Sequence, residues 1–94
     1  MTQPRISIIG TGLIGASIGL GLAARRDRNY EIVGADRDRS AARTARKVGA
    51  LDREVGSLEE AASGAGLIVL AVPVVAARQI LKDIGPYIVR GTVI

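Results

Sequence analysis

The chain has 94 residues, 48% of them hydrophobic, and its thirteen Lys and Arg against nine Asp and Glu give a net charge of +4. This length suits one small domain, and this share of apolar residues supplies a well-filled core. The absence of cysteine and histidine excludes a disulfide framework, argues against a metal site and fits a reducing, cytoplasmic compartment. Because the basic residues alternate with acidic ones and no aromatic platform accompanies them, we expect solvated faces and no nucleic-acid partner.

One uncharged stretch, residues 6–24, has the length of a short membrane span or leader. Five glycines between Gly10 and Gly21 dilute its hydrophobicity, and the alternation of strand and helix patterns continues beyond it. We therefore expect neither a membrane segment nor a targeting peptide.

The first half of the chain predicts two strands, each followed by a helix. Residues 5–9 and 31–35 are rich in β-branched residues, as in strands covered on both faces. A helix is expected over 13–25, and Asp38 can cap a second helix that ends at Gly49. On that helix, one face carries Ala41, Ala45 and Val48, and another carries Arg39, Arg43 and Arg46.

The third strand and helix are predicted to be short. Residues 51–54 form an edge strand in this interpretation. Ser57 and Glu60 have the spacing of a capping box for a brief helix that ends near Gly64. The most apolar run, residues 67–72, predicts a central parallel strand.

After Pro73, which stops that strand, a helix is predicted over 74–84 and Gly85-Pro86 ends it. Its buried face is expected to hold Ala77, Ile80, Leu81 and Ile84. Residues 92–94 begin a further strand. This succession requires parallel strands and right-handed crossovers, so the predicted fold is α/β, a Rossmann-type doubly wound sheet that is incomplete at its carboxyl end. Because the last residues would leave an apolar edge, we expect a truncated protein.

A glycine-rich loop lies between the first predicted strand and helix. It reads Gly10-Thr11-Gly12-Leu13-Ile14-Gly15 and matches the pattern G-x-G-x-x-G. In this context Gly10 permits a tight turn, Gly12 lets a pyrophosphate approach the backbone, and Gly15 lets the helix pack closely on the strand. The amides at the helix start and the helix dipole favour an anion. We therefore interpret the loop as a dinucleotide site, and a turn needed only for packing is the alternative; Gly19 is expected to continue the close packing.

Asp36 follows the second predicted strand, about twenty residues after the glycine loop, where a carboxylate accepts hydrogen bonds from the adenosine ribose. This position favours NAD, because a carboxylate repels the 2′-phosphate of NADP. Arg37 can stack on adenine or neutralise such a phosphate, which leaves NADP open. The alternative is that Asp36 only caps a turn and Arg37 is solvated.

The segment Ala71-Val72-Pro73-Val74 lies at the carboxyl end of the fourth predicted strand. This position is beside the switch point where open α/β sheets bind ligands. The proline either lines a cofactor cleft or simply ends the strand.

Four segments together resemble the amino-terminal NAD(P)-binding domain of prephenate and arogenate dehydrogenases: residues 8–17, 34–37, 47–52 and 70–74. The resemblance spans this chain but only the first part of such an enzyme, and Ala16 replaces a glycine common in the family. It implies an oxidoreductase of tyrosine biosynthesis, a homodimer when full length, with a helical second domain and a small carboxylate substrate that is oxidatively decarboxylated. It also implies that residues 10–15 lie at the pyrophosphate, Asp36 and Arg37 at the adenosine, and Val72–Val74 against ribose and nicotinamide.

No catalytic residue is assigned in this chain. In the family, a histidine after the fifth strand and arginines of the second domain act on the substrate, and this sequence ends before them. We therefore expect cofactor binding without turnover, and we interpret Ser17 as a small helix-packing residue because it has no base partner. The alternatives are another small-substrate reductase, of the β-hydroxyacid or pyrroline-carboxylate type, and a non-catalytic NAD(H)-sensing module.

Overall fold

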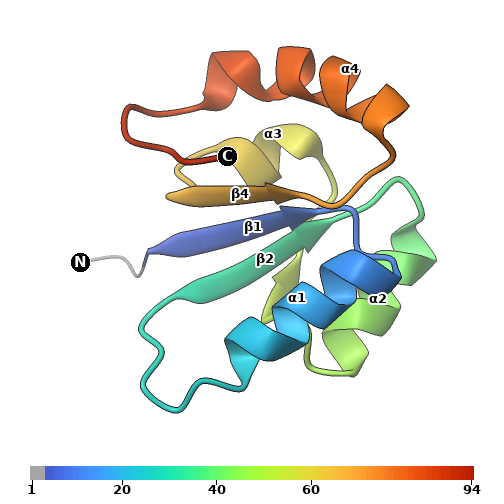
Figure 1. Ribbon diagram of the computed structural model, residues 1–94, viewed down its shortest axis with the longest axis vertical. Coiled ribbons are helices and arrows are strands. Elements are labelled where there is room, and N and C mark those ends of the chain that lie inside the picture. The colour runs from blue at the N-terminus through green and yellow to red at the C-terminus, as the bar shows by residue number, and fades with distance from the viewer. Residues whose placement is uncertain (1–3) are drawn as a thin grey trace.

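A parallel sheet forms the centre of the molecule in the computed structural model, which describes residues 4–94 (Figure 1). Within this range the strands are β1 (Arg5–Ile9), β2 (Glu31–Ala35), β3 (Arg53–Glu54) and β4 (Leu67–Leu70), in the order β3-β2-β1-β4. Helices α1 (Leu13–Ala23) and α2 (Arg39–Lys47) cover one face. Helices α3 (Leu58–Ala62) and α4 (Val74–Ile84) cover the other, and a 3-10 helix, η1 (Gly85–Tyr87), follows α4. The predicted α/β fold with a parallel, doubly wound sheet is confirmed.

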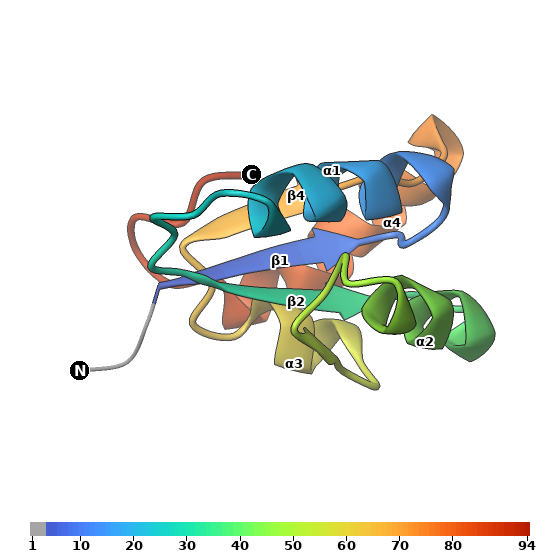
Figure 2. The same cartoon turned by 90° about the horizontal axis from the view of Figure 1, so that it is seen from below.

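The direction in which the chain moves across the sheet explains these two layers. From β1 through β2 to β3 it steps toward one edge, and right-handed crossovers place α1 and α2 on the same face (Figure 2). It then crosses back to β4, so that α3 and α4 lie on the opposite face. Ile9 is in register with Ala35 of β2 and Leu70 of β4. The segments that follow β1, β2 and β4 therefore begin side by side at the carboxyl ends of these strands.

Alternating residues of the strands fill two apolar cores. Ile9, Val33 and Ile68 pack toward α3 and α4, where Ile84 is fully buried. Ile8 and Ile32 pack on the other face, toward α1 and α2. Side chains alternate between faces along a strand, and each buried aliphatic side chain contributes about 1.5–3 kcal/mol. The sheet is thus fixed from both sides.

Most predicted elements have the expected bounds, and the differences occur at their ends. The first helix ends at Ala23 rather than at residue 25, and β4 ends at Leu70 rather than at residue 72. The short strand β3 holds two residues instead of four. The N-caps are as predicted: Asp38 accepts from the amides of Ser40 and Ala41, and Ser57 accepts from the amide of Glu60, which is the serine half of the predicted capping box.

Two predicted helix faces need correction. The face of α2 that contacts the sheet holds Ala42 and Ala45, whereas Val48 is 56% exposed and Ala41 is half-buried. In α4, Ile84 is buried as expected, but Leu81 is 42% exposed. In α4 the predicted face is otherwise confirmed, because Ile80 packs on the core beside Ile84 and Leu81 alone lies outside the contact with the sheet. In α2 the buried stripe is narrower than the apolar pattern indicated and includes Ala42 in place of Ala41.

The predicted carboxyl-terminal strand is reduced to a single bridge. Val93 pairs in parallel with Leu67, and the Ile68 amide donates to the Val93 carbonyl at 2.8 Å. The chain therefore returns alongside β4 in the expected direction.

The uncharged residues 6–24 form most of β1, the glycine loop and α1 rather than one long helix. Among residues 4–94, no helix combines the length and the apolar character that crossing a membrane requires.

Candidate functional site

The glycine loop makes a sharp turn that only glycine allows. Gly10 has a φ of +95°, a conformation that side chains with a Cβ rarely adopt. A Cβ at Gly10 would also lie 2.3 Å from the Ala71 carbonyl oxygen. The Gly10 amide donates to the Ala35 carbonyl at 2.9 Å. The turn is thereby held between β2 and the segment after β4.

Two further glycines let α1 approach the sheet closely. A Cβ at Gly15 would lie 1.8 Å from the Gly10 carbonyl oxygen. A Cβ at Gly19 would lie 2.3 Å from the Ala50 carbonyl oxygen, in the connection between α2 and β3. The expected packing roles of Gly15 and Gly19 are confirmed, and together they fix the direction in which the start of α1 points.

Gly12 differs from its neighbours because nothing crowds it. It is the N-cap of α1, no side chain caps the helix, and a Cβ built there meets no atom within 4 Å. The first intrahelical bond runs from the Ala16 amide to the Gly12 carbonyl at 2.8 Å. The amides before Ala16 in the first turn are therefore available to an anion, which the helix dipole also favours.

Asp36 follows β2 at the carboxyl end of the sheet, next to the glycine loop that follows β1, and it is hydrogen-bonded to that loop. The Thr11 amide donates to Asp36 Oδ2 at 2.7 Å and the Thr11 hydroxyl donates to the same oxygen at 3.1 Å. The Asp38 amide donates to Asp36 Oδ1 at 2.9 Å. The position of Asp36 was predicted, but this contact with Thr11 was not; it follows from the pairing of β1 with β2, which places their following residues side by side.

The start of α2 adds charge to the same edge. Arg37 and Arg39, at the start of α2, are exposed. Arg43, Arg46 and Lys47, further along the helix, are exposed as well, and the exposure of the basic residues from Arg39 to Lys47 agrees with the expected solvated face. The side chain of Ser40 and the backbone amides of Ala41 and Ser40 hold the pKa of Asp38 below its ordinary value. The carboxylate of Asp38 is therefore charged as a cap, while Asp36 points back to the glycine loop.

A cleft of about 580 Å³ separates the glycine loop from the end of β4. A volume of this size is within the range of small-ligand sites. The cleft is lined by Gly12, Leu13, Ile14, Leu70, Ala71, Val72 and Pro73. Pro73 is the N-cap of α4, and Val74 begins that helix with 89% of its surface exposed. The predicted segments 10–15 and 72–74 therefore meet at the carboxyl end of the sheet together with Ala71, and Leu70 is a further lining residue at the end of β4.

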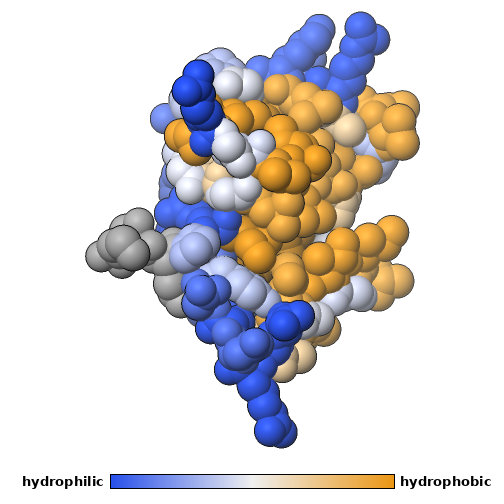
Figure 3. All heavy atoms as spheres, turned by 60° about the vertical axis from the view of Figure 1, so that its left-hand side comes forward, coloured by the Kyte–Doolittle hydropathy of each residue, from blue (hydrophilic) through white to orange (hydrophobic). Residues whose placement is uncertain are grey.

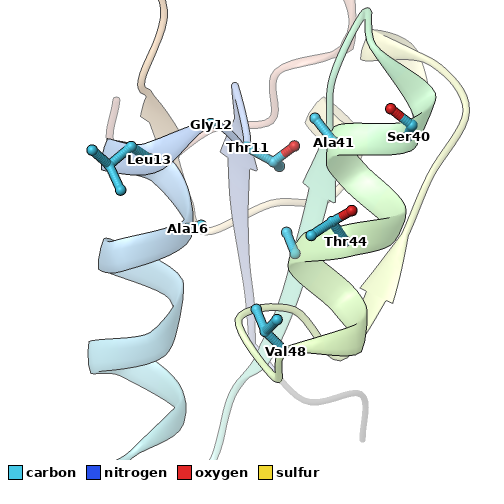
Figure 4. A pocket seen from close by; sticks show the side chains of 9 residues that line it. Thr11, Gly12, Leu13, Ala16, Ser40, Ala41, Thr44 and Val48 are labelled. Atoms are coloured by element: carbon cyan, nitrogen blue, oxygen red, sulfur yellow. The ribbon is translucent and has the colours of Figure 1, made fainter.

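A second, smaller groove of about 370 Å³ lies between α1 and α2 (Figure 4). Thr11 points toward α2 in this view, and Ser40, Thr44 and Val48 line the opposite wall. The two cavities share Gly12 and Leu13. Ser17 does not belong to either: it is exposed, and its hydroxyl donates to the Leu13 carbonyl at 2.7 Å. The prediction that Ser17 packs against a neighbouring element is therefore wrong, because its side chain is exposed and donates to the backbone of its own helix.

The fold and the loop define a Rossmann-type α/β domain with a glycine-rich turn at the carboxyl edge of a parallel sheet. The family model described as NADP oxidoreductase coenzyme F420-dependent matches residues 5–94. This chain belongs to that family.

Individual relatives narrow the comparison. The chain is 40% identical over 83 residues to a prephenate dehydrogenase of Lactococcus lactis, a match that covers 88% of this chain and 23% of the relative. It is similar to a Synechocystis arogenate dehydrogenase structure, with a TM-score of 0.80, 27% identity and 95% of this chain and 31% of that chain covered. The resemblance to prephenate and arogenate dehydrogenases is confirmed, and the chain spans about a quarter to a third of these proteins.

The fold alone also matches a prephenate dehydrogenase of A. aeolicus, solved in complex with hydroxyphenyl propionate and NAD⁺. The TM-score is 0.84 at 22% identity, over 99% of this chain and 33% of that chain.

Proposed function

We propose that this chain is the dinucleotide-binding part of an NAD-dependent prephenate or arogenate dehydrogenase. Residues 10–15 hold the pyrophosphate, Asp36 and Arg37 hold the adenosine, and Val72–Val74 lie beside ribose and nicotinamide. The bound nicotinamide supplies the hydride acceptor. The whole protein then oxidatively decarboxylates a small carboxylate substrate in tyrosine biosynthesis, as a cytoplasmic homodimer, and this chain contributes cofactor binding without turnover.

The observation that carries this proposal is the open space at Gly12. Helix α1 begins there with no capping side chain, and no atom would meet a Cβ at this position within 4 Å. A phosphate needs such free amides and close approach to the backbone. Gly10 and Gly15 are explained by contacts within the protein, whereas the absence of a side chain at Gly12 is explained by a ligand. The cleft beside Gly12 has the volume that a ligand needs.

The choice of NAD over NADP rests on Asp36. Its two oxygens are held by donors of the chain itself, so the carboxylate stays at the edge where the adenosine ribose lies in this proposal. A fixed negative charge there repels a 2′-phosphate, whereas it accepts a hydrogen bond from a free hydroxyl. The A. aeolicus structure contains NAD⁺ and the family description names NADP, so the choice between the two nucleotides rests on Asp36. The alternative reductases and the sensing module have no better support.

Substitution of Gly12 tests the proposal directly. We expect calorimetry to detect NAD binding by the wild-type chain and at least about tenfold weaker binding by Gly12→Ala, because the new methyl group occupies the space of the pyrophosphate. The melting temperature of Gly12→Ala should remain close to the wild-type value, because the φ of Gly12 is −71° and its Cβ has no clash.

Gly21→Ala is the matched control, because a Cβ at Gly21 would also have free space but Gly21 lies in the last turn of α1, at the opposite end of the helix from Gly12. It should bind NAD as the wild type does. Equal NAD affinity of wild type and Gly12→Ala would contradict the proposal.

A further inference from the structure

The bond between Thr11 and Asp36 connects the two parts of the proposed nucleotide site. Thr11 is only 4% exposed, and both its amide and its hydroxyl donate to Asp36 Oδ2. Oδ1 receives one bond within the described part of the chain, from the Asp38 amide at 2.9 Å. A carboxylate oxygen accepts about two hydrogen bonds. Oδ2 is therefore saturated by the glycine loop, whereas Oδ1 retains an acceptor site.

We propose that Thr11 is a positioning residue that sets the preference for NAD. Its hydroxyl holds Oδ2 of Asp36 against the glycine loop and turns Oδ1 toward the adenosine ribose. This inference rests on the proposed function, because it assumes that Asp36 accepts a bond from that ribose.

Any residue at position 11 except proline has a backbone amide that could donate to Asp36. The amide therefore does not distinguish one sequence from another in nucleotide preference. The hydroxyl is the part that the sequence adds. Valine has nearly the shape of threonine but neither donates nor accepts a hydrogen bond, so Thr11→Val removes the hydroxyl with little change in the size of the side chain. Without the hydroxyl, Asp36 keeps its charge and two backbone donors but loses one of the bonds that restrict its orientation.

This geometry predicts unequal effects on the two nucleotides. Because the lost bond orients Asp36 and does not itself contact the nucleotide, NAD binding should weaken by about threefold to tenfold, which is less than the loss of a direct bond to a charged group would cause. NADP makes no favourable bond to the carboxylate in this account, so its affinity should change by less than about twofold. The ratio of the two affinities should therefore fall in Thr11→Val and recover in Thr11→Ser, which restores the donor.

The experiment measures NAD and NADP dissociation constants for wild type, Thr11→Val, Thr11→Ser, Asp36→Ala and the double variant Thr11→Val/Asp36→Ala. If Thr11 acts through Asp36, the valine substitution should weaken NAD binding in the wild-type background and have no effect in the Asp36→Ala background. Melting temperatures of all five proteins separate a loss of folding from a loss of orientation.

Three results would overturn the inference. Equal weakening of NAD and NADP by Thr11→Val would show that the residue supports only the loop, and so would the same loss of NAD affinity in both backgrounds. An unchanged NAD affinity in a folded Thr11→Val protein would show that the hydroxyl has no role. In each of these cases wild-type NAD binding, and with it the proposed function, still stands; a wild-type chain that binds neither nucleotide would contradict both.

Discussion

At the residue scale, Asp52 ties the segment before β2 to the segment before β3. It accepts a bidentate pair of bonds from Arg28 at 2.8 and 2.9 Å and a third bond from the Ile32 amide at 2.8 Å. The Arg28 side chain is the main cause that holds the pKa of Asp52 below its ordinary value; burial opposes this shift, and the Ile32 amide adds to it. Asp52 is therefore charged and bonded in the folded protein throughout the neutral range.

The stability of the protein should for this reason fall in acid. Because the folded pKa of Asp52 is lower than its unfolded value, near 3.8, its contribution is complete above that value and is lost as the pH falls through the folded pKa. Asp52→Asn should lower the free energy of unfolding at neutral pH by about 1 kcal/mol, a figure reduced for partial exposure. Urea denaturation at several pH values measures the difference.

Asp27→Asn is the control for this test, because Asp27 is 81% exposed and meets Arg25 only at 3.6 Å. It should leave the free energy of unfolding nearly unchanged. The difference between wild type and Asp52→Asn should shrink below the folded pKa of Asp52. A difference that is constant from neutral to acid pH would refute the assignment to this carboxylate.

At the element scale, α1 is held on the sheet by contacts that require the absence of side chains. Gly19→Ala should lower the free energy of unfolding by about 1–3 kcal/mol, because its Cβ would meet the backbone of Ala50 at 2.3 Å. Gly21→Ala lies in the same helix without such a contact and should raise stability by up to about 1 kcal/mol through helix propensity. Chemical denaturation of both variants tests this, and equal stabilities would show that α1 does not pack as described.

The same elements show what could be predicted from the sequence. The glycine loop was placed correctly because each glycine has a separate geometric cause, and Asp38 and Ser57 were recognised by the short spacing of their caps. The predicted face of α2 included Ala41, whereas the structure buries Ala42 beside Ala45. Alanine at all three positions is compatible with more than one rotation of the helix, and only the contact with the sheet selects one. The bond between Thr11 and Asp36 depends on which strands are neighbours, and spacing along the chain does not contain that information.

At the scale of the whole molecule, the residues of the proposed site are drawn from three segments that leave β1, β2 and β4 at one edge. In the view of Figure 3, hydrophobic residues gather on one side, and hydrophilic residues lie on the other side and at the top and bottom. Apolar residues remain exposed on α1, at the start of α4 and at the carboxyl terminus, including Leu13, Ile14, Val74, Val75, Val93 and Ile94. Of these, Leu13 and Ile14 line the cleft beside Gly12 together with Leu70 and Val72, so that cleft has the mainly apolar lining typical of a cofactor site.

The most direct test of this account is an amide NMR titration of the 94-residue chain with NAD. We predict that resonances of residues 10–15, Asp36, Arg37, Val72 and Val74 shift together along one binding curve, while those of α3 remain in place. Resonances that stay unchanged at saturating NAD, or shifts confined to Thr44 and Val48 in the groove between α1 and α2, would contradict it.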